Sequence, residues 1–347
     1  MAQVGSAGNA SIATGVKPPT PWLTLAPAGT LTRIGVGSCL DQRHPQPIWR
    51  AVLAARPQLF LMIGDNVYGD VKAPELAELK AAYHQQGRHP EFAKVRGALP
   101  FLAVWDDHDF GLNDGGRDFR YAGAAKALFH EFWQTRPERE VGVHSAEIFG
   151  PPGRRVQIIL LDTRSFRSAL KPKTSAFAHW GRYEPDPDPG KTVLGSEQWA
   201  WLESELGKPA DIRLLASSIQ VLAEGHGFER WGNLPAERDR LLGLIDRSRA
   251  RGLVLLSGDR HSGALYRSKT PGGRLLVEMT TSSLNRSYGP SKDARVPPLV
   301  GEPYHPENFG LVDIDWSART IQISLRAMDG GEVGRQSMTF ADLGHGP

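Results

Sequence analysis

From Leu31 onwards, the chain alternates short apolar runs of strand length with longer stretches of helical character. The candidate strands are residues 33–36, 59–63, 101–104, 156–161, 213–216, 253–256, 275–278, 311–314 and 320–325. Candidate helices are 47–55, 74–86, 119–134, 196–206 and 236–251. The strands consist mostly of Leu, Ile and Val, which is typical of strands buried on both faces. The alternation predicts an α/β fold. Because nine strands are many for one flat sheet, we expect two packed sheets with helices outside.

Five polar clusters follow directly after predicted strands. They are 37–39 (Gly-Ser-Cys), 64–68 (Gly-Asp-Asn-Val-Tyr), 105–109 (Trp-Asp-Asp-His-Asp), 217–220 (Ser-Ser-Ile-Gln) and 257–261 (Ser-Gly-Asp-Arg-His). The C-terminal ends of strands are where α/β sheets place ligands. Together the clusters offer a thiol, a phenol, several carboxylates and two imidazoles. This is a ligand set for more than one metal ion.

Each cluster also has a simpler explanation when it is taken alone. A lone cysteine after a strand is more often an inert buried residue than a ligand. A Gly-Asp pair is usually a turn or a helix cap. The neighbouring Asp106 and Asp107 repel each other, so a helix N-terminus or a cation must compensate. The occurrence of five such clusters after strands favours a shared metal site over five unrelated turns.

Composition excludes several classes of protein. Hydrophobic residues make up 40% and charged residues 23% of the chain, which is typical of globular proteins. The formal charge of +3 suits a small anionic substrate but is too weak to indicate nucleic-acid binding. No apolar run approaches the roughly 18 residues that a membrane helix needs.

Residues 1–30 are rich in Ala, Gly, Ser, Thr and Pro and show no signal peptide. We expect a flexible lead-in there, followed by one domain over residues 31–347; whether a targeting segment has been removed stays open.

The motifs together resemble those of the calcineurin-like metallophosphoesterase superfamily. The resemblance is carried by Gly-Asp-x-x-Tyr at 64–68, Asp-His at 107–108 and Gly-Asp-x-His at 258–261. Segments 37–39, 105–109, 257–261 and 194–202 point more narrowly to its alkaline phosphatase D family. The similarity extends over about residues 34–316. It implies a four-layer αββα sandwich of two mixed β-sheets flanked by helices, with a dinuclear metal site between the sheets.

The resemblance also implies which residues bind the metals. Carried over by position, the residues that would hold a ferric ion are Cys39, Asp65, Tyr68 and His261. Asp65 would bridge to a second ion, calcium by resemblance with other divalent ions possible, which Asp107 and Asp259 would also bind. His108 occupies the position of the substrate-facing histidine. Purple acid phosphatases have histidines where this chain has Gln220 and Asp259, so their metal pair is not implied here.

These residues predict a phosphoesterase acting on phosphomonoesters, phosphodiesters or both. Two cations roughly 3.5–4 Å apart can clamp a phosphoryl group and activate a water as hydroxide. In this scheme Asp107 contributes to catalysis through the metal, and His108 is the candidate general acid for the leaving alkoxide. The weaker candidates for contact with substrate are Asn113, Arg164, Gln220 and Arg260. A glycine-rich turn explains Asn113 equally well, as does a structural amide for Gln220. Further candidates for the pocket or a lid are His179, Trp180, His226, Trp231, Asn233, His305 and Asn308.

Two other functions stay open at this point. Ser38 or Ser217 could be the nucleophile of a serine-dependent ester hydrolase, but neither lies in Gly-x-Ser-x-Gly and the aspartates would be surplus. A non-catalytic metal- or phosphate-binding protein would need the same ligands but not His108. The family resemblance implies an alkaline pH optimum and a periplasmic or extracellular location, with a cytoplasmic one still possible. The sequence does not indicate the oligomeric state.

Overall fold

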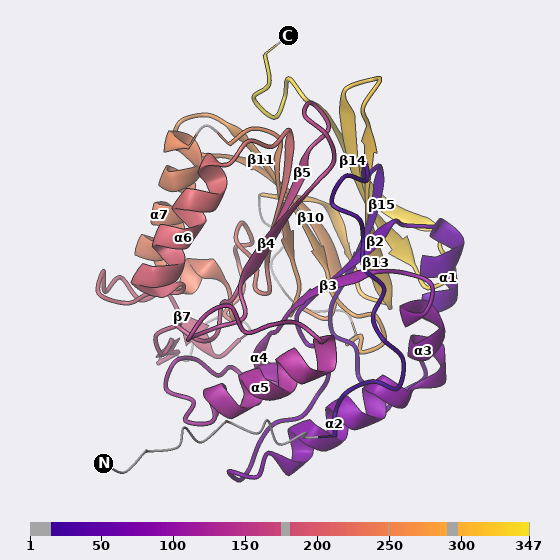
Figure 1. The fold of residues 1–347 in the computed structure, drawn as a ribbon. Coiled ribbons are helices and arrows are strands. Elements are labelled where there is room, and N and C mark those ends of the chain that lie inside the picture. Colours follow the sequence, from indigo (N-terminus) through magenta and orange to yellow (C-terminus); the bar gives the residue numbers. More distant parts are fainter. Residues whose placement is uncertain (1–14, 175–180, 249, 290–297, 347) are drawn as a thin grey trace, which may run out of the picture.

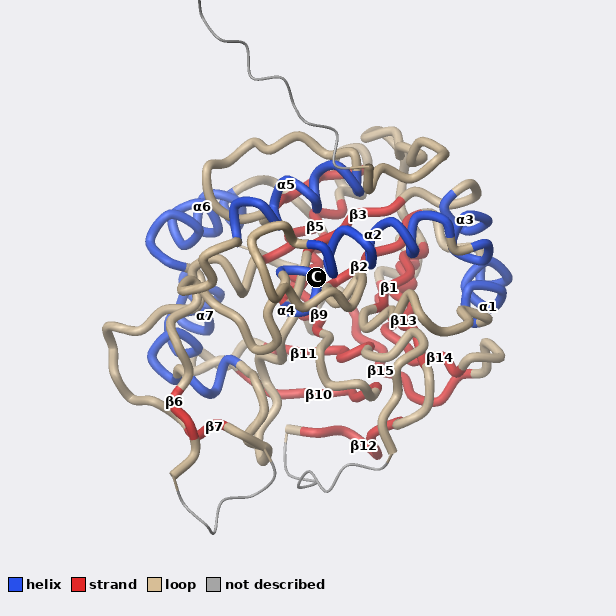
Figure 2. The backbone as a smooth tube through the Cα atoms, turned by 90° about the horizontal axis from the view of Figure 1, so that it is seen from below, coloured by secondary structure: helices blue, strands red, loops and turns tan. Residues whose placement is uncertain are grey.

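The computed structural model describes residues 15–174, 181–248, 250–289 and 298–346. Two large β-sheets pack on each other, and helices cover their outer sides (Figure 1, Figure 2). Helices α6 (Gly195–Gly207) and α7 (Pro235–Arg247) lie on one side. On the other side are α1 (Ile48–Ala55), α2 (Ala77–Arg88), α3 (Pro90–Arg96) and α5 (Ala122–Trp133). The expected four-layer αββα sandwich is therefore confirmed.

The first sheet has the strand order β15-β14-β13-β1-β2-β3. Its strands are β1 (Arg33–Gly37), β2 (Leu59–Ile63), β3 (Phe101–Val104), β13 (Asn308–Asp315), β14 (Thr320–Ala327) and β15 (Glu332–Thr339). Strands β1, β2 and β3 run parallel, whereas β13, β14 and β15 form an antiparallel meander that pairs with β1. The sheet is therefore mixed, as expected, and its parallel half ends in three of the five polar clusters.

The second sheet has the order β12-β10-β11-β9-β8-β5-β4. Its strands are β4 (Ser145–Phe149), β5 (Val156–Leu161), β8 (Ile212–Ser217), β9 (Leu253–Ser257), β10 (Gly263–Lys269), β11 (Leu275–Thr281) and β12 (Leu299–Tyr304). The central strands β5, β8, β9 and β11 are parallel, and the outer strands are antiparallel to their neighbours. A small separate ribbon pairs β6 (Lys171–Pro172) with β7 (Tyr183–Glu184). The parallel strands β8 and β9 end in the other two clusters.

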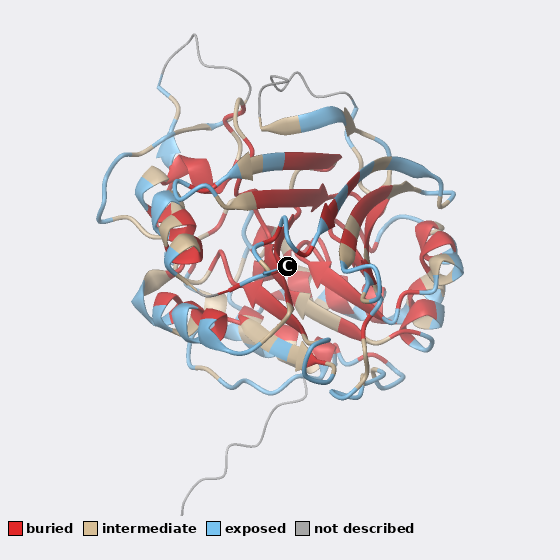
Figure 3. Ribbon diagram, turned by 90° about the horizontal axis from the view of Figure 1, so that it is seen from above, coloured by how far each residue is buried: buried red, intermediate tan, exposed pale blue. Residues whose placement is uncertain are grey.

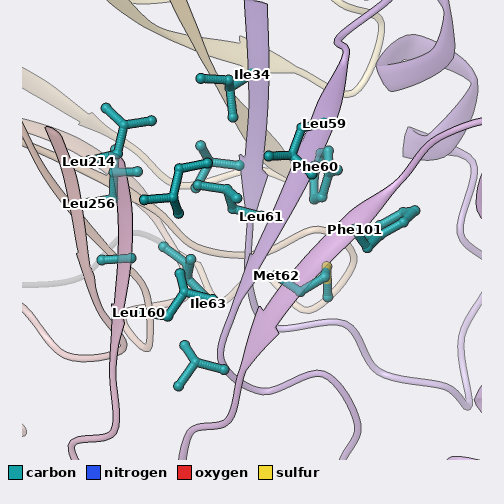
Figure 4. Close-up of a cluster of buried hydrophobic side chains, with 14 of the residues drawn as sticks. Ile34, Leu59, Phe60, Leu61, Met62, Ile63, Phe101, Leu160, Leu214 and Leu256 are labelled. Carbon is teal, nitrogen blue, oxygen red and sulfur yellow. The ribbon is translucent and has the colours of Figure 1, made fainter. Parts of the chain in front are cut away.

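The core lies between the sheets and extends under the helices (Figure 3). Ile34 and Leu61 of the first sheet belong to the same buried cluster as Leu160, Leu214 and Leu256 of the second (Figure 4). Every residue of β2, β5, β8 and β9 is buried, and their side chains are mostly apolar, as expected of strands covered on both faces; the buried polar exceptions are Gln157, Arg213, Ser217 and Ser257. None of the helices in the described ranges is long and apolar enough to cross a membrane.

Part of the predicted lead-in packs on the domain. Val16 is buried, and the ring of Trp22 stacks on Trp133 of α5 with centroids 4.5 Å apart. The indole N–H of Trp22 donates to the carbonyl of Phe132 at 2.8 Å. These contacts hold Trp22 against α5, whereas the character of the lead-in as a whole stays a prediction. The domain boundary at residue 31 stays a prediction.

Candidate metal centre

The five polar clusters meet at one edge of the sandwich. They follow β1, β2 and β3 in the first sheet and β8 and β9 in the second, and parallel neighbours end at the same edge. Backbone hydrogen bonds connect the loops. The N–H of Leu40 donates to the carbonyl of Asp65 at 2.9 Å, and the N–H of Ser283, after β11, donates to the carbonyl of Ser38 at 3.3 Å. The second bond joins the two sheets beside the site.

Four predicted ligands surround one point. The Asp65 carboxylate oxygen Oδ2 lies 3.4 Å from the Cys39 sulfur and 3.0 Å from the Tyr68 hydroxyl. The Tyr68 hydroxyl lies 3.3 Å from Nε2 of His261. All four side chains are buried. The carbonyl of Arg286 contacts Nδ1 of His261, which makes Nδ1 the protonated nitrogen and directs the Nε2 lone pair towards the other three groups.

A second group of carboxylates shares Asp65 with the first. Asp65, Asp106, Asp107 and Asp259 each offer an oxygen, and these oxygens lie within 4.8 Å of one another. Asp106, for which the sequence indicated repulsion with Asp107, is the N-cap of α4 (Asp107–Phe110). Its carboxylate pairs with Arg164 and accepts a hydrogen bond from Ser218 at 2.6 Å. Its other oxygen, Oδ2, is buried with no hydrogen-bond partner in the described chain. The arrangement offers donors for two neighbouring cations.

The backbone is strained at the same positions. Left-handed φ angles of 57°, 48°, 65° and 52° occur at Cys39, Asp65, Asp259 and His261 respectively. Such angles cost a non-glycine residue about 1–2 kcal/mol, so the surrounding structure must impose them. Gly64, with φ 118°, has no such cost, and a Cβ there would come within 2.6 Å of the Asp106 Cβ. Strain concentrated at four candidate ligands is typical of a functional site.

The pKa shifts in the cluster indicate that its acidic groups need a nearby positive charge to ionise. Burial, and next the charge of Asp107, raise the pKa of Asp65 and of Asp259 well above the usual range. Burial and the charge of Asp65 likewise raise the pKa of the Tyr68 phenol. Burial lowers the pKa of His261 to about 4, so its imidazole is neutral and can act as a ligand. Carboxylates and a phenol that resist ionisation in isolation are stabilised as anions by bound cations, so this donor set fits a metal pair.

His108 is oriented beside the carboxylates. Its backbone N–H donates to Asp107 Oδ1 at 2.8 Å, and its ring Nδ1 lies 3.0 Å from Asp70. Burial lowers the pKa of His108, but Asp107, Asp65 and Asp70 raise it more, to about 11. The ring also contacts the Tyr68 ring, with centroids 4.4 Å apart. The three carboxylates thus favour the protonated imidazole in the chain without bound cations, and Asp70 orients the ring.

A cavity of about 300 Å³ opens over the cluster. Its lining includes Asp107, His108, Asn113, Asp259, Arg260 and His261. Two of the weaker candidates, Asn113 and Arg260, thus lie where a substrate could contact them. His305, also predicted for the pocket, lines it too. The cavity is open to solvent above a floor of acidic groups.

The other two candidate substrate contacts do not line this cavity. Arg164 is buried and pairs with Asp106 and Glu229, so it neutralises these carboxylates from behind the site. Gln220 is buried in a hydrogen-bond network, donating to the Tyr266 hydroxyl and the Thr280 hydroxyl, both at 2.9 Å. Their positions favour structural roles, because Arg164 is already ion-paired and Gln220 already hydrogen-bonded to other buried side chains.

The alternative nucleophiles are also engaged elsewhere. The hydroxyl of Ser38 donates to the carbonyl of Thr281 at 3.0 Å. That of Ser217 donates to the carbonyl of Ile219 at 2.7 Å. Both serines are buried, and neither lines the cavity described above. This geometry disfavours the serine-dependent ester hydrolase.

Some residues at the site had no signal in the sequence. Asp70 and Arg286 carry no motif of their own, and each was recognisable only through its contact with a histidine. Glu229 carried no motif either. Its carboxylate and that of Asp114, which the sequence offered with Asn113 as either a glycine-rich turn or a loop contacting substrate, lie within 4.8 Å of an oxygen of Asp107. Of the weaker pocket candidates, those that are buried and do not line the cavity are His226, Trp231, Asn233 and Asn308. His179 and Trp180 lie outside the described residues.

Comparisons with known proteins place the chain in a family. A model of the PhoD-like phosphatase family matches residues 34–322. Alkaline phosphatase D of Bacillus subtilis (strain 168) is 23% identical over 268 residues, which cover 65% of this chain and 45% of that protein. The chain therefore spans about half the length of the curated relative that it matches.

Two solved structures share the fold. A structure of PhoD has a TM-score of 0.71 at 16% identity and covers 92% of this chain and 70% of its own. GAP50, the anchor in the inner membrane complex of Plasmodium, has a TM-score of 0.57 at 14% identity, covering 91% of this chain and 96% of its own. At such identities the likeness concerns the fold alone.

Proposed function

The chain belongs to the PhoD-like phosphatase family, and on this basis we propose that it is a metal-dependent phosphoesterase acting on phosphomonoesters, phosphodiesters or both. One observation carries the proposal. Six side chains from the loops after β1, β2, β3 and β9 converge on one cluster, in which Asp259 is partly buried and the others are buried, namely Cys39, Asp65, Tyr68, Asp107, Asp259 and His261. So many ionisable groups are brought together out of water only where a cation offsets their desolvation.

We assign the two groups of donors to two different ions. Cys39, Asp65, Tyr68 and His261 would hold a ferric ion, because a phenolate, a thiolate and a carboxylate supply the negative charge that it favours. Asp65, Asp107 and Asp259 would hold a second ion, proposed as calcium, because all their donors are carboxylate oxygens. When bound, the ions would act as Lewis acids on the phosphoryl oxygens and lower the pKa of a water molecule.

The remaining steps belong to side chains of the cavity. Asp70 contacts Nδ1 of His108, so Nε2 is the nitrogen that we expect to donate a proton to the leaving alkoxide. Arg260 lines the cavity and would attract the non-bridging oxygens of the phosphate. The substrate would be a small phosphate ester, consistent with a cavity of about 300 Å³. Export of the natural protein, which the family resemblance implies, stays a proposal.

The direct test combines metal analysis with hydrolysis. Purified protein is analysed for bound iron and calcium and assayed with an aryl phosphate and a bis-aryl phosphate. Asp65→Asn removes the charge shared by both groups, so we expect it to lose both ions and to lower kcat on the order of 100-fold or more. Asp239→Asn, at an exposed position of α7, is the matched control. If neither ester is hydrolysed by the protein supplied with iron and calcium, the proposal is wrong.

A further inference from the structure

Tyr288 presents an unusual exposed ring beside the candidate metal centre. It is 58% exposed, the largest value among the exposed large hydrophobic side chains of the described chain, and it lines the cavity over the cluster. Its ring stacks on the imidazole of His261, with centroids 4.2 Å apart and planes inclined by 23°. Tyr288 therefore contacts one of the candidate ligands, His261, directly.

The ring is supported on one face although it is exposed. The imidazole of His261, on which it stacks, is itself positioned by the backbone carbonyl of Arg286 at Nδ1. The guanidinium of the same arginine pairs with Asp41. Tyr288 thus rests on a ring that the surrounding chain holds in place. A ring fixed before binding loses little conformational entropy when a ligand packs on it.

The space next to this ring suits a flat group. One face of Tyr288 is covered by His261, and the following residue, Gly289, has no side chain; a Cβ there would meet nothing within 4 Å. Across the lining, the guanidinium of Arg260 lies 4.3 Å from the centroid of the Phe228 ring. The cavity therefore combines an acidic floor, a cation and an exposed aromatic ring. Binding sites fix ligands through such a mixture of aromatic surface and a few polar groups.

We propose that Tyr288 is a stacking platform for the organic part of the substrate. The preferred substrates would be phosphate esters that carry a planar aromatic ring, either an aryl group or a nucleobase. An aryl ring is attached to phosphorus through a single oxygen, so it must lie close to the bound phosphoryl group, where Tyr288 stands. This inference rests on the proposed function for its substrate chemistry, but its test measures binding without turnover.

The test compares two ligands of equal charge and similar size. Phenylphosphonate is planar in its organic group and cyclohexylphosphonate is not, and both are titrated calorimetrically into the protein as purified. We expect phenylphosphonate to have a Kd about tenfold lower, in line with the contribution of one stacked ring. Tyr288→Phe should keep the preference and Tyr288→Leu should remove it. Met328→Ala, which truncates a side chain that is 43% exposed elsewhere, should keep it as the matched control.

A second pair of ligands distinguishes the source of the ring. This pair consists of the phosphonate analogues of uridine 5′-monophosphate and ribose 5-phosphate, in which a methylene group replaces the ester oxygen so that neither is hydrolysed. If the ring is a nucleobase, the uridine analogue binds more tightly than the ribose analogue and loses this advantage in Tyr288→Leu; if it is an aryl group, only the phenyl and cyclohexyl pair responds. Equal Kd values within both pairs, no binding of any of the four ligands, or a preference unchanged in Tyr288→Leu would overturn the inference. The proposed function would still be judged by hydrolysis. A preference that depends on Tyr288, found in a protein that hydrolyses no ester, would support the platform and contradict the enzyme.

Discussion

His108 is the residue that separates an enzyme from a protein that only binds metal. It lies beside the candidate ligands but is not among the six side chains assigned to the ions. We therefore expect His108→Ala to retain iron and calcium while kcat falls about 10²–10⁴-fold, the usual contribution of a general acid. The loss should be larger for an alkyl phosphate than for an aryl phosphate, because the poorer leaving group depends more on protonation. Elemental analysis and steady-state kinetics measure both effects.

The matched control is His84→Ala, which removes an exposed imidazole from α2. It should leave kcat and metal content as in the wild type. An unchanged kcat in His108→Ala would contradict the role of general acid. A wild-type protein that contains both metals yet hydrolyses no phosphate ester would instead favour the non-catalytic metal-binding alternative.

The sequence indicated the side chains at strand ends and missed the residues that hold them. Cys39, Asp65 and His261 follow apolar runs directly, so their shared location could be predicted from the order of strand and polar cluster. Arg286 could not be recognised, because its partner Asp41 lies 245 positions away. Arg164 was expected at the substrate for its charge alone, and only the fold shows its buried partner Glu229.

At the level of elements, the prediction of strands succeeded where burial on both faces gives a continuous apolar run. All nine apolar runs form strands, because strands covered on both faces need apolar side chains throughout. The strands that were missed carry polar residues and lie at or near sheet edges. β15 (Glu332–Thr339) exposes alternate residues at the edge of the first sheet, and β12 (Leu299–Tyr304) has no fully buried residue. Their pairing depends on neighbouring strands, which a search for apolar runs cannot detect.

The segment before β1 also behaves as an element of the domain, and Trp22 tests this. Trp22→Ala would remove the stack on Trp133 and the hydrogen bond to the Phe132 carbonyl. We expect a loss of about 2–4 kcal/mol in the free energy of unfolding, near the lower end for buried aromatic residues because Trp22 is only half-buried. Urea denaturation measures the loss. Leu23→Ala, at a neighbouring residue that is 42% exposed, should change it by less than about 0.5 kcal/mol. Equal effects of both changes would show that this packing contributes nothing.

At the level of the whole molecule, the site is where ionisable groups of the two sheets come together. Elsewhere the space between the sheets is mainly apolar, with Leu61 and Leu214 in one buried cluster, although Gln336 of β15 donates to the carbonyl of Tyr266 of β10 at 3.1 Å. At the strand ends, Asp65 and Asp107 of the first sheet face Asp259 and His261 of the second. Carboxylates from both sheets repel each other there unless a cation lies between them. Bound metal would therefore contribute to holding the sandwich together as well as to chemistry.

Removal of the metals should accordingly weaken the entire fold. Burial and mutual repulsion raise the pKa values of Asp65 and Asp259, so their ionised forms destabilise the protein when no cation is bound. We expect exhaustive chelation to lower the thermal midpoint, and added calcium to raise it by an amount that grows with the free concentration of the ion, since a ligand at 100 times its Kd contributes about 2.7 kcal/mol. Differential scanning calorimetry of chelated and reloaded protein measures this shift. Asp65→Asn should respond less to both treatments, because one of the repelling charges is gone. A thermal midpoint that is insensitive to chelation, in protein shown to have lost its ions, would contradict a metal bridge between the sheets.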